Sequence, residues 1–203
     1  MVELLLDGRE HSVQELARAG GVALSTASEH LGRLETGGVV VSRRAGRERL
    51  ARLAGPVVAA AYEGLAELSR DAPVNGLRAW NRREELRAAR TCYDHLAGRL
   101  GVALAEAALE ARAVTPEFAL GPRAASWFAG FGVDVEALPR GRRPLLRVCT
   151  DWTERREHLA GALGAGLCSA VLDAGWVVRR PATRGLRLTP LGEASFRRLG
   201  VQA

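Results

Sequence analysis

Apolar positions at the start of the chain recur with the period of amphipathic helices. In the segment HSVQELARAGG, Ser12 and Glu15 have the spacing of a capping box, and Gly20 stands where a helix would stop. Ser25 is then a natural N-cap for a second helix, which is expected to end before Gly37. The pattern therefore predicts two short helices joined by a tight turn, the arrangement of a helix-turn-helix.

The second of these helices has two different faces. At about 100° per residue, one stripe is apolar and can pack on the first helix; it consists of Ala27, Leu31 and Leu34. The other stripe carries polar groups able to reach base edges and phosphates. Its members are Thr26, Glu29, His30 and Arg33. This division predicts a helix that packs on one side and offers the other side to DNA.

A basic hairpin is expected directly after the second helix. The β-branched run VVVS leads into a turn near residues 44–46 and then into a return strand. Five arginines fall on this hairpin: Arg43, Arg44, Arg47, Arg49 and Arg52. Such a cluster is typical of the wing of a winged helix lying along a phosphate backbone. Alternatively, the hairpin is a solvated face and the two helices are a plain packing unit. Together these elements form a predicted DNA-binding domain over residues 1–68.

A helix is predicted from Pro56 to about Leu68, because proline suits the first turn of a helix. Its apolar residues are Val57, Val58, Ala61, Leu65 and Leu68. This face is expected either to form a dimer contact or to cover the core of the N-terminal domain.

The second half contains an internal repeat. After a Pro- and Gly-containing linker at residues 69–78, residues 95–114 align without gaps on residues 158–177, with eleven identical positions. We expect two units, residues 79–138 and 139–203, each ordered helix, short helix, hairpin, helix. The predicted fold is thus mainly α with small β-hairpins: an N-terminal winged helix-turn-helix followed by two winged-helix-like repeats. The duplication either enlarges a core and a dimer surface or encloses a pocket.

Cysteine, histidine and aspartate recur in both repeats, and thiolate and imidazole are good ligands for Zn²⁺. The candidates for a metal or effector site are Cys92, His95, Cys149, Asp151 and His158. Cys92 and His95 are three apart and would share one helix face. The alternative is that these residues pack or cap helices, since the spacings differ between the repeats and no CxxC pair is present. Cys168 is interpreted as a core residue. The sequence identifies no cofactor with certainty, and Zn²⁺ or another divalent metal is the candidate that these residues suggest.

The composition of the chain bears on its binding partners and on its cellular location. The formal charge is +6, and every one of the 29 basic residues is arginine, which fits phosphate binding but also a GC-rich genome. Three cysteines without a signal-peptide pattern are typical of a reducing cytoplasm. The longest uncharged stretch, Leu159 to Leu172, is shorter than the ~20 residues that a membrane-spanning helix needs. We therefore expect a cytoplasmic protein with no membrane partner.

The chain from residue 3 to about residue 68, above all STASEHLGRLETGGVV, resembles the winged-helix domain of ArsR-type bacterial transcriptional regulators. The resemblance implies a dimeric repressor and adds Ser25 and Ser28 to the DNA-reading residues. It also implies a full helix before LLLDGRE, within which this chain begins. The metal ligands familiar in that family are absent, because the first motif helix has no cysteine and the helix after the hairpin has neither Asp nor His. The repeats resemble the C-terminal extension of long members.

Three functions remain open for this chain. The leading hypothesis is a sequence-specific, dimeric repressor that binds an inverted-repeat operator in double-stranded DNA and is released by an unidentified small effector. A metal- or thiol-responsive sensor and a protein-interaction scaffold are the alternatives. An enzyme with a thiol nucleophile or a metal centre is disfavoured, because no nucleotide or phosphate-loop motif is present.

Overall fold

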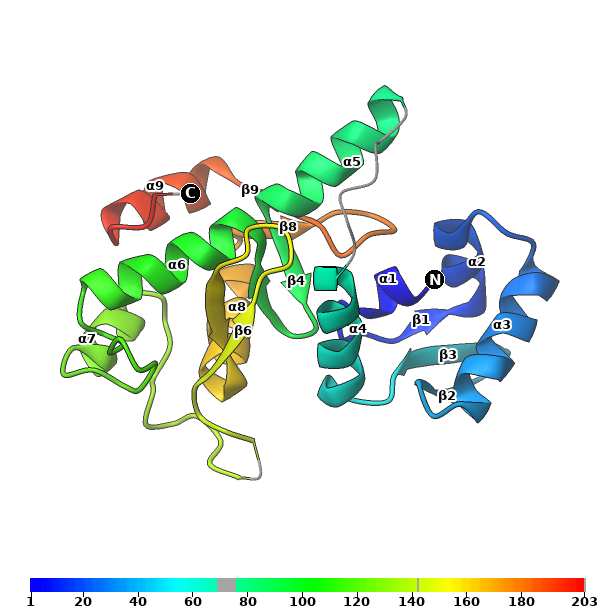
Figure 1. Ribbon diagram of the computed structural model, residues 1–203, viewed down its shortest axis with the longest axis horizontal. Coiled ribbons are helices and arrows are strands. Elements are labelled where there is room, and N and C mark those ends of the chain that lie inside the picture. The colour runs from blue at the N-terminus through cyan, green and yellow to red at the C-terminus, as the bar shows by residue number, and fades with distance from the viewer. Residues whose placement is uncertain (69–75, 142, 203) are drawn as a thin grey trace.

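The protein consists of helices and small antiparallel sheets, as the hydrophobic pattern predicts (Figure 1). The computed structural model describes residues 1–68, 76–141 and 143–202. None of the helices in these ranges is long and apolar enough to cross a membrane. Two hydrophobic cores form, one from the N-terminal elements and one from residues 89–201.

The N-terminal elements surround a three-stranded antiparallel sheet of order β1-β3-β2. Ala51 and Leu53 of β3 are fully buried, so this strand lies at the centre of the core. The helices and strands of this part are α1 (Val2–Leu5), β1 (His11–Ser12), α2 (Val13–Gly20), α3 (Leu24–Thr36), β2 (Val40–Ala45), β3 (Glu48–Leu53) and α4 (Pro56–Leu68).

Most of the local signals in this part are confirmed. Ser12 and Glu15 form the capping box at the start of α2, and the helix is closed by Gly21 in the left-handed conformation. The N-cap predicted at Ser25 is wrong. Helix α3 begins at Leu24, two residues earlier than that N-cap implies, and its N-cap Ala23 makes no side-chain hydrogen bond. The backbone of Ala23 is extended, so the chain enters α3 without a capping hydroxyl group.

The second half is built from paired strands and helices. Its elements are α5 (Leu77–Ala88), β4 (Arg90–Cys92), β5 (His95–Ala97), α6 (Gly98–Glu110), α7 (Ala124–Ala129), β6 (Arg147–Thr150), β7 (Glu157–Ala160), α8 (Gly161–Asp173), β8 (Val177–Arg179), β9 (Leu186–Leu188) and α9 (Pro190–Arg198). Of the predicted linker, residues 69–75 lie outside the described residues, and its end already belongs to α5.

The predicted order of helix, short helix, hairpin, helix is wrong at its start in both repeats, whereas its final hairpin and helix are present in the second repeat as β8-β9 and α9. In each repeat a two-stranded hairpin, β4-β5 after α5 or β6-β7, leads directly into a long helix, α6 or α8. A second strand pair follows, reduced in the first repeat to the bridge between Val114 and Leu120. The strands were missed because segments of three or four residues are too short to show a period of two.

The two repeats and the N-terminal elements are in direct contact. The segment before β9 runs beside β4, where Thr91 N–H donates to the carbonyl of Arg184 at 3.0 Å. Helix α4 lies between the N-terminal sheet and the β4-β5 hairpin (Figure 1). The first hairpin therefore lies where the three parts of the chain meet.

Candidate functional site

The first candidate surface lies on α3, which α2 positions. Ala27 and Leu31 are fully buried against the N-terminal core, and Leu34 is partly buried, as the apolar stripe predicts. The opposite side of the helix is turned to solvent. The exposed residues there are Ser25, Ser28, Glu29, His30 and Arg33, whereas Thr26 is half-buried. One exposed ion pair links Arg33 to Glu29 at 2.8 Å.

Four of the five hairpin arginines fall into two groups. Arg43 donates to Glu10 at 2.8 Å, and Arg49 pairs with Glu35 of α3 and donates to Ser42 at 3.0 Å. These contacts tie the hairpin to the rest of the N-terminal part. Arg44 and Arg47 lie exposed near the turn and have no ion-pair partner in the described part of the chain. Their guanidinium groups are therefore available to a phosphate.

The start of α3 and the turn end of the hairpin line a common groove. This open groove of about 670 Å³ is bounded by the starts of α2 and α3 and by the hairpin. Ser25, Ser28 and Arg47 all line it. Hydroxyl groups and a free guanidinium thus face one space on the surface, an arrangement able to hold a phosphate backbone.

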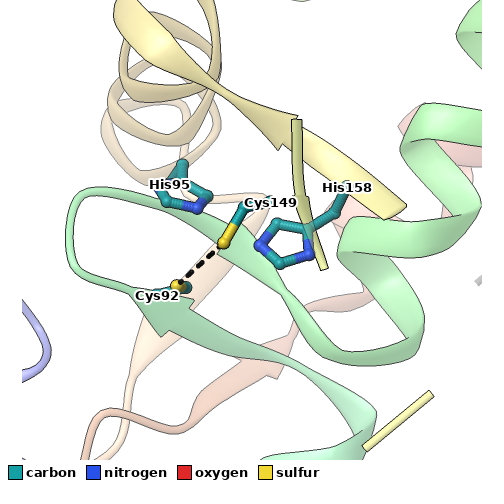
Figure 2. Close-up of side chains that lie close together, drawn as sticks. All are labelled: Cys92, His95, Cys149 and His158. Atoms are coloured by element: carbon teal, nitrogen blue, oxygen red, sulfur yellow. Dashed lines mark hydrogen bonds between the residues drawn. The ribbon is translucent and has the colours of Figure 1, made fainter. Parts of the chain in front are cut away.

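The second candidate site joins the two repeats. Cys92 lies directly opposite His95 in the β4-β5 hairpin, and Cys149 lies directly opposite His158 in the β6-β7 hairpin. The four side chains point toward one another (Figure 2). One ligand atom from each lies within 4.8 Å of every other, and the two sulfur atoms are 3.8 Å apart. The expected shared helix face of Cys92 and His95 is wrong, because both residues lie on strands.

The imidazoles of this cluster are buried without their usual partners. His95 is 3% exposed and His158 is 1% exposed, and their rings stack with centroids 5.1 Å apart. Nε2 of His95 and both ring nitrogens of His158 have no hydrogen-bond partner among the described residues. A buried polar atom without a partner costs about 1–3 kcal/mol, so these nitrogens favour a bound ligand.

The two thiols are electrostatically different. The hydrogen bond from Cys92, together with the adjacent imidazoles, holds the pKa of Cys149 well below its ordinary value, although burial opposes this. The same hydrogen bond and burial raise the pKa of Cys92 well above its ordinary value. Burial lowers the pKa of His95, but Asp94 and Cys149 outweigh it, so the net direction is upward. One thiolate is thus favoured in the absence of any bound cation.

A carboxylate stands behind each histidine. Oδ1 of Asp94 lies 3.4 Å from Nδ1 of His95, and Oδ2 of Asp151 lies 3.9 Å from Nδ1 of His158. Asp151 is therefore beside the cluster but is not one of the four converging groups. Asp94 was missed by sequence reasoning. Both aspartates follow a cysteine by two residues, so the C-x-D pattern common to the repeats is the signal that could have found it.

Each aspartate is fixed by an arginine from the other repeat. Arg90 pairs with Asp151 at 2.9 Å, and both side chains are almost fully buried. Arg143 donates to Asp94 at 2.9 Å, in a pair that is about one-third exposed. These arginines hold the pKa of both carboxyl groups well below the usual range, although burial opposes them. Both aspartates therefore remain charged.

Two helical glycines allow the histidines to approach each other. A Cβ on Gly101 would lie 2.5 Å from the carbonyl oxygen of Leu96 and 3.5 Å from Cβ of His158. A Cβ on Gly164 would lie 2.4 Å from the carbonyl oxygen of Leu159 and 3.2 Å from Cβ of His95. The repeated HLAG-x-LG pattern thus supplies both the histidine and the space for the histidine of the other repeat.

The cluster adjoins the junction with the N-terminal part. Tyr93, next to Cys92, donates its backbone N–H to the carbonyl of Leu6 at 2.6 Å. Arg184, which is 1% exposed, donates to Glu3 at 2.9 Å and pairs with the buried Glu63 of α4. Sequence reasoning missed this network, because its members are far apart along the chain.

No protein-family model matches this chain. The uncharacterized HTH-type transcriptional regulator YdfF of Bacillus subtilis (strain 168) is 37% identical over 195 residues, which cover 95% of this chain and 86% of that protein. A solved fragment of a possible transcriptional regulatory protein from Mycobacterium bovis is 38% identical, covering 30% of this chain and 69% of that one, with a TM-score of 0.29.

Proposed function

Since the chain belongs to the HTH-type transcriptional regulators, we propose that it is a winged-helix repressor of the ArsR type, dimeric and specific for an inverted-repeat operator. The regulators of this family bind DNA and are not enzymes, so a thiol-nucleophile or metal-hydrolase function is set aside. The observation that carries the finer proposal is the common groove on which Ser25, Ser28 and Arg47 converge.

In this proposal α3 is the recognition helix. Its exposed residues His30 and Arg33 contact base edges, and each good bidentate contact contributes ~1–3 kcal/mol of discrimination between bases. Arg33 must exchange its partner Glu29 for a base, which costs little because an exposed pair contributes only about 0–1 kcal/mol. Ser25, Thr26 and Ser28 lie at the start of the helix, where a recognition helix approaches the groove.

The hairpin supplies affinity that does not depend on sequence. Arg44 and Arg47 contact phosphates, since they are exposed and have no ion-pair partner within the described ranges. Arg43 and Arg49 instead hold the hairpin against Glu10 and Glu35. Of the five arginines on the hairpin, Arg44 and Arg47 therefore bind DNA in this proposal, and Arg43 and Arg49 position the strands that carry them.

Dimerisation is assigned to the outer face of α4. Val58 and Ala59 pack on the N-terminal core, whereas Val57, Leu65 and Leu68 are 80%, 68% and 80% exposed. Large apolar side chains exposed together on one helix favour a partner surface. A second copy fits the operator symmetry, because a twofold dimer binds half-sites whose centres are about 10 base pairs apart or a multiple of that.

The test compares binding to DNA from upstream of the gene with binding to scrambled DNA of equal length, by fluorescence anisotropy across a salt series. We expect tight binding to the upstream DNA alone. Arg44→Ala with Arg47→Ala should flatten the dependence of log K on log salt by about 0.9 for each phosphate that is no longer neutralised. Arg197→Ala with Arg198→Ala is the matched control, since it removes the same charge from the exposed end of α9.

Two results would contradict the proposal. Equal and weak binding to both DNAs would leave only a basic protein. An unchanged salt dependence in the hairpin variant would support the alternative of a protein-interaction scaffold that does not use this surface for DNA.

A further inference from the structure

We propose that Cys92, His95, Cys149 and His158 bind one Zn²⁺ ion per chain in tetrahedral coordination by two sulfur and two nitrogen atoms. Two ligands come from each repeat, so the ion would join the two repeats. The binding of the ion does not depend on the proposed function, whereas an effect of the ion on DNA affinity rests on that function.

The spacing of the sulfur atoms fits this coordination. With a Zn–S bond of about 2.3 Å, the edge between two sulfur ligands of a tetrahedron is about 3.8 Å. The distance between the two Sγ atoms is 3.8 Å. All four ligand atoms lie within 4.8 Å of one another, so small side-chain rotations bring the two nitrogens to the shorter Zn–N distance.

The imidazole nitrogens that have no hydrogen-bond partner distinguish a metal site from ordinary packing. A histidine buried for structural reasons normally has hydrogen-bond partners. Nε2 of His95 and both ring nitrogens of His158 have none among the described residues. A disulfide between the cysteines would leave these nitrogens unpartnered, whereas a metal ion uses one from each ring.

The surroundings of the histidines match those of metal ligands. A metal-bound histidine usually directs its second ring nitrogen toward a carboxylate, which fixes the ring and raises its basicity. Asp94 lies beside Nδ1 of His95, which leaves Nε2 facing the cluster. Asp151 lies on the corresponding side of His158. The same arrangement in both repeats is independent of the sulfur geometry and points to the same ligand.

An entry route and the choice of ion follow from the ligands. Cys149 is half-buried, whereas Cys92, His95 and His158 are buried, so an ion would enter on the side of Cys149. Two thiolates and two neutral imidazoles suit Zn²⁺, and they exclude the oxygen-seeking Ca²⁺ and Mg²⁺.

The position of the site connects it to the DNA-binding part. Cys92 precedes Tyr93, whose N–H donates to Leu6, and follows Thr91, whose N–H donates to Arg184. Arg184 in turn pairs with Glu63 on α4, the proposed dimer helix. An ion that fixes Cys92 therefore fixes the residues on either side of it, which contact Leu6 at the end of α1 and the arginine of the α4 ion pair. We expect Zn²⁺ to change operator affinity by about 5- to 150-fold, the usual range of coupling between two sites.

The experiment uses the full chain, kept reduced and freed of metal, and titrates it with Co²⁺ as a spectroscopic substitute for Zn²⁺. We expect the absorption of tetrahedral Co²⁺ with a sulfur-to-cobalt charge-transfer band, saturation at one equivalent, and displacement by Zn²⁺. Cys149→Ser should weaken binding by at least ~100-fold, more than a change to a residue behind the ligands does. Cys168→Ser is the matched control, since Cys168 is buried in the core and burial raises its pKa to about 12.

Each outcome decides one part of the proposal. An octahedral spectrum, a Cys149→Ser variant that binds Co²⁺ as the parent does, or a disulfide that forms in place of the complex would overturn the metal site. Asp94→Asn, which keeps all four ligands, should lose affinity by about 10- to 100-fold and so tests the site without removing a ligand.

The regulatory part has its own readout. Operator affinity is measured with and without Zn²⁺ in the parent and in Cys149→Ser. Tetrahedral binding with unchanged operator affinity would overturn the coupling and leave a site that only joins the repeats. Failure to bind any DNA would overturn the proposed function, while the cobalt spectrum would still decide the metal site.

Discussion

The two repeats place the same pair of side chains face to face although their hairpins differ in length. In the first, two residues separate Cys92 from His95, and in the second, eight residues separate Cys149 from His158. Strand register, not sequence spacing, sets a cysteine opposite a histidine in both. As a sequence pattern, the difference in spacing argued against a shared site. In the structure it reflects only the different lengths of the two turns. Equivalent positions in a repeat are thus better recognised by their strand than by their separation.

The repeats differ most in how they hold the aspartate behind each histidine. Asp151 is fully buried and accepts hydrogen bonds from Arg90 and from the backbone N–H of Gly98. Asp94 lies in a hairpin turn, where it is paired with the partly exposed Arg143. We therefore expect Asp151 mainly to stabilise the fold of the repeats, and Asp94 mainly to orient His95. Changes at Asp151 and at Arg143 test this contrast, and changes at the two helical glycines test what the repeats share.

The largest effect is expected for Asp151→Asn. The change leaves the buried guanidinium of Arg90 without its counter-charge, and breaking a buried pair in this way costs about 3–5 kcal/mol in the free energy of unfolding. Urea denaturation in the presence of a chelator measures this cost without a contribution from bound metal. Adding Arg90→Met should recover part of the loss. A cost below ~1 kcal/mol in the single variant would mean that the pair is not buried as described.

A smaller effect is expected for the two helical glycines, and it should be similar in both repeats. The added methyl group of Gly101→Ala or Gly164→Ala meets a backbone oxygen at about 2.5 Å, which should destabilise each variant by ~1–3 kcal/mol. Gly32→Ala on α3 is the control with the opposite sign. No atom lies within 4 Å of its Cβ position, so this change should stabilise the helix by up to ~1 kcal/mol. Thermal and chemical unfolding of the three variants would check the comparison, and a large difference between the two repeat variants would break it.

The smallest effect on stability is expected for Arg143→Ala. Its pair with Asp94 is 40% and 30% exposed, and pairs of this kind contribute about 0–1 kcal/mol. The change should leave the unfolding midpoint nearly unchanged, while metal affinity falls because Asp94 is held less firmly behind His95. The two measurements on one variant separate a stabilising role from a positioning role. A loss of several kcal/mol in the free energy of unfolding would mean that Asp94, like Asp151, stabilises the fold.

The N-terminal part was predicted more completely than the repeats. The capping box of Ser12 and Glu15, the helix from Pro56 to Leu68 and the hairpin after α3 are all confirmed. These features depend on neighbours within about four residues or on long periodic segments. In the repeats, the short strands carried no such period, and the Cys92–His95 segment was therefore assigned to a helix although it is a hairpin.

The sequence by itself determined the local elements of the N-terminal part, the outward polar stripe of α3, the duplication and the residue types of the Cys/His site. Local hydrogen bonds and side-chain periodicity are sufficient for these features. Tertiary structure alone decided that the two Cys–His pairs meet, that arginines cross between the repeats, and that Arg184 joins them to α4. Those contacts connect residues 49 to 121 positions apart. Their geometry depends on how the packed elements meet, which no local pattern specifies.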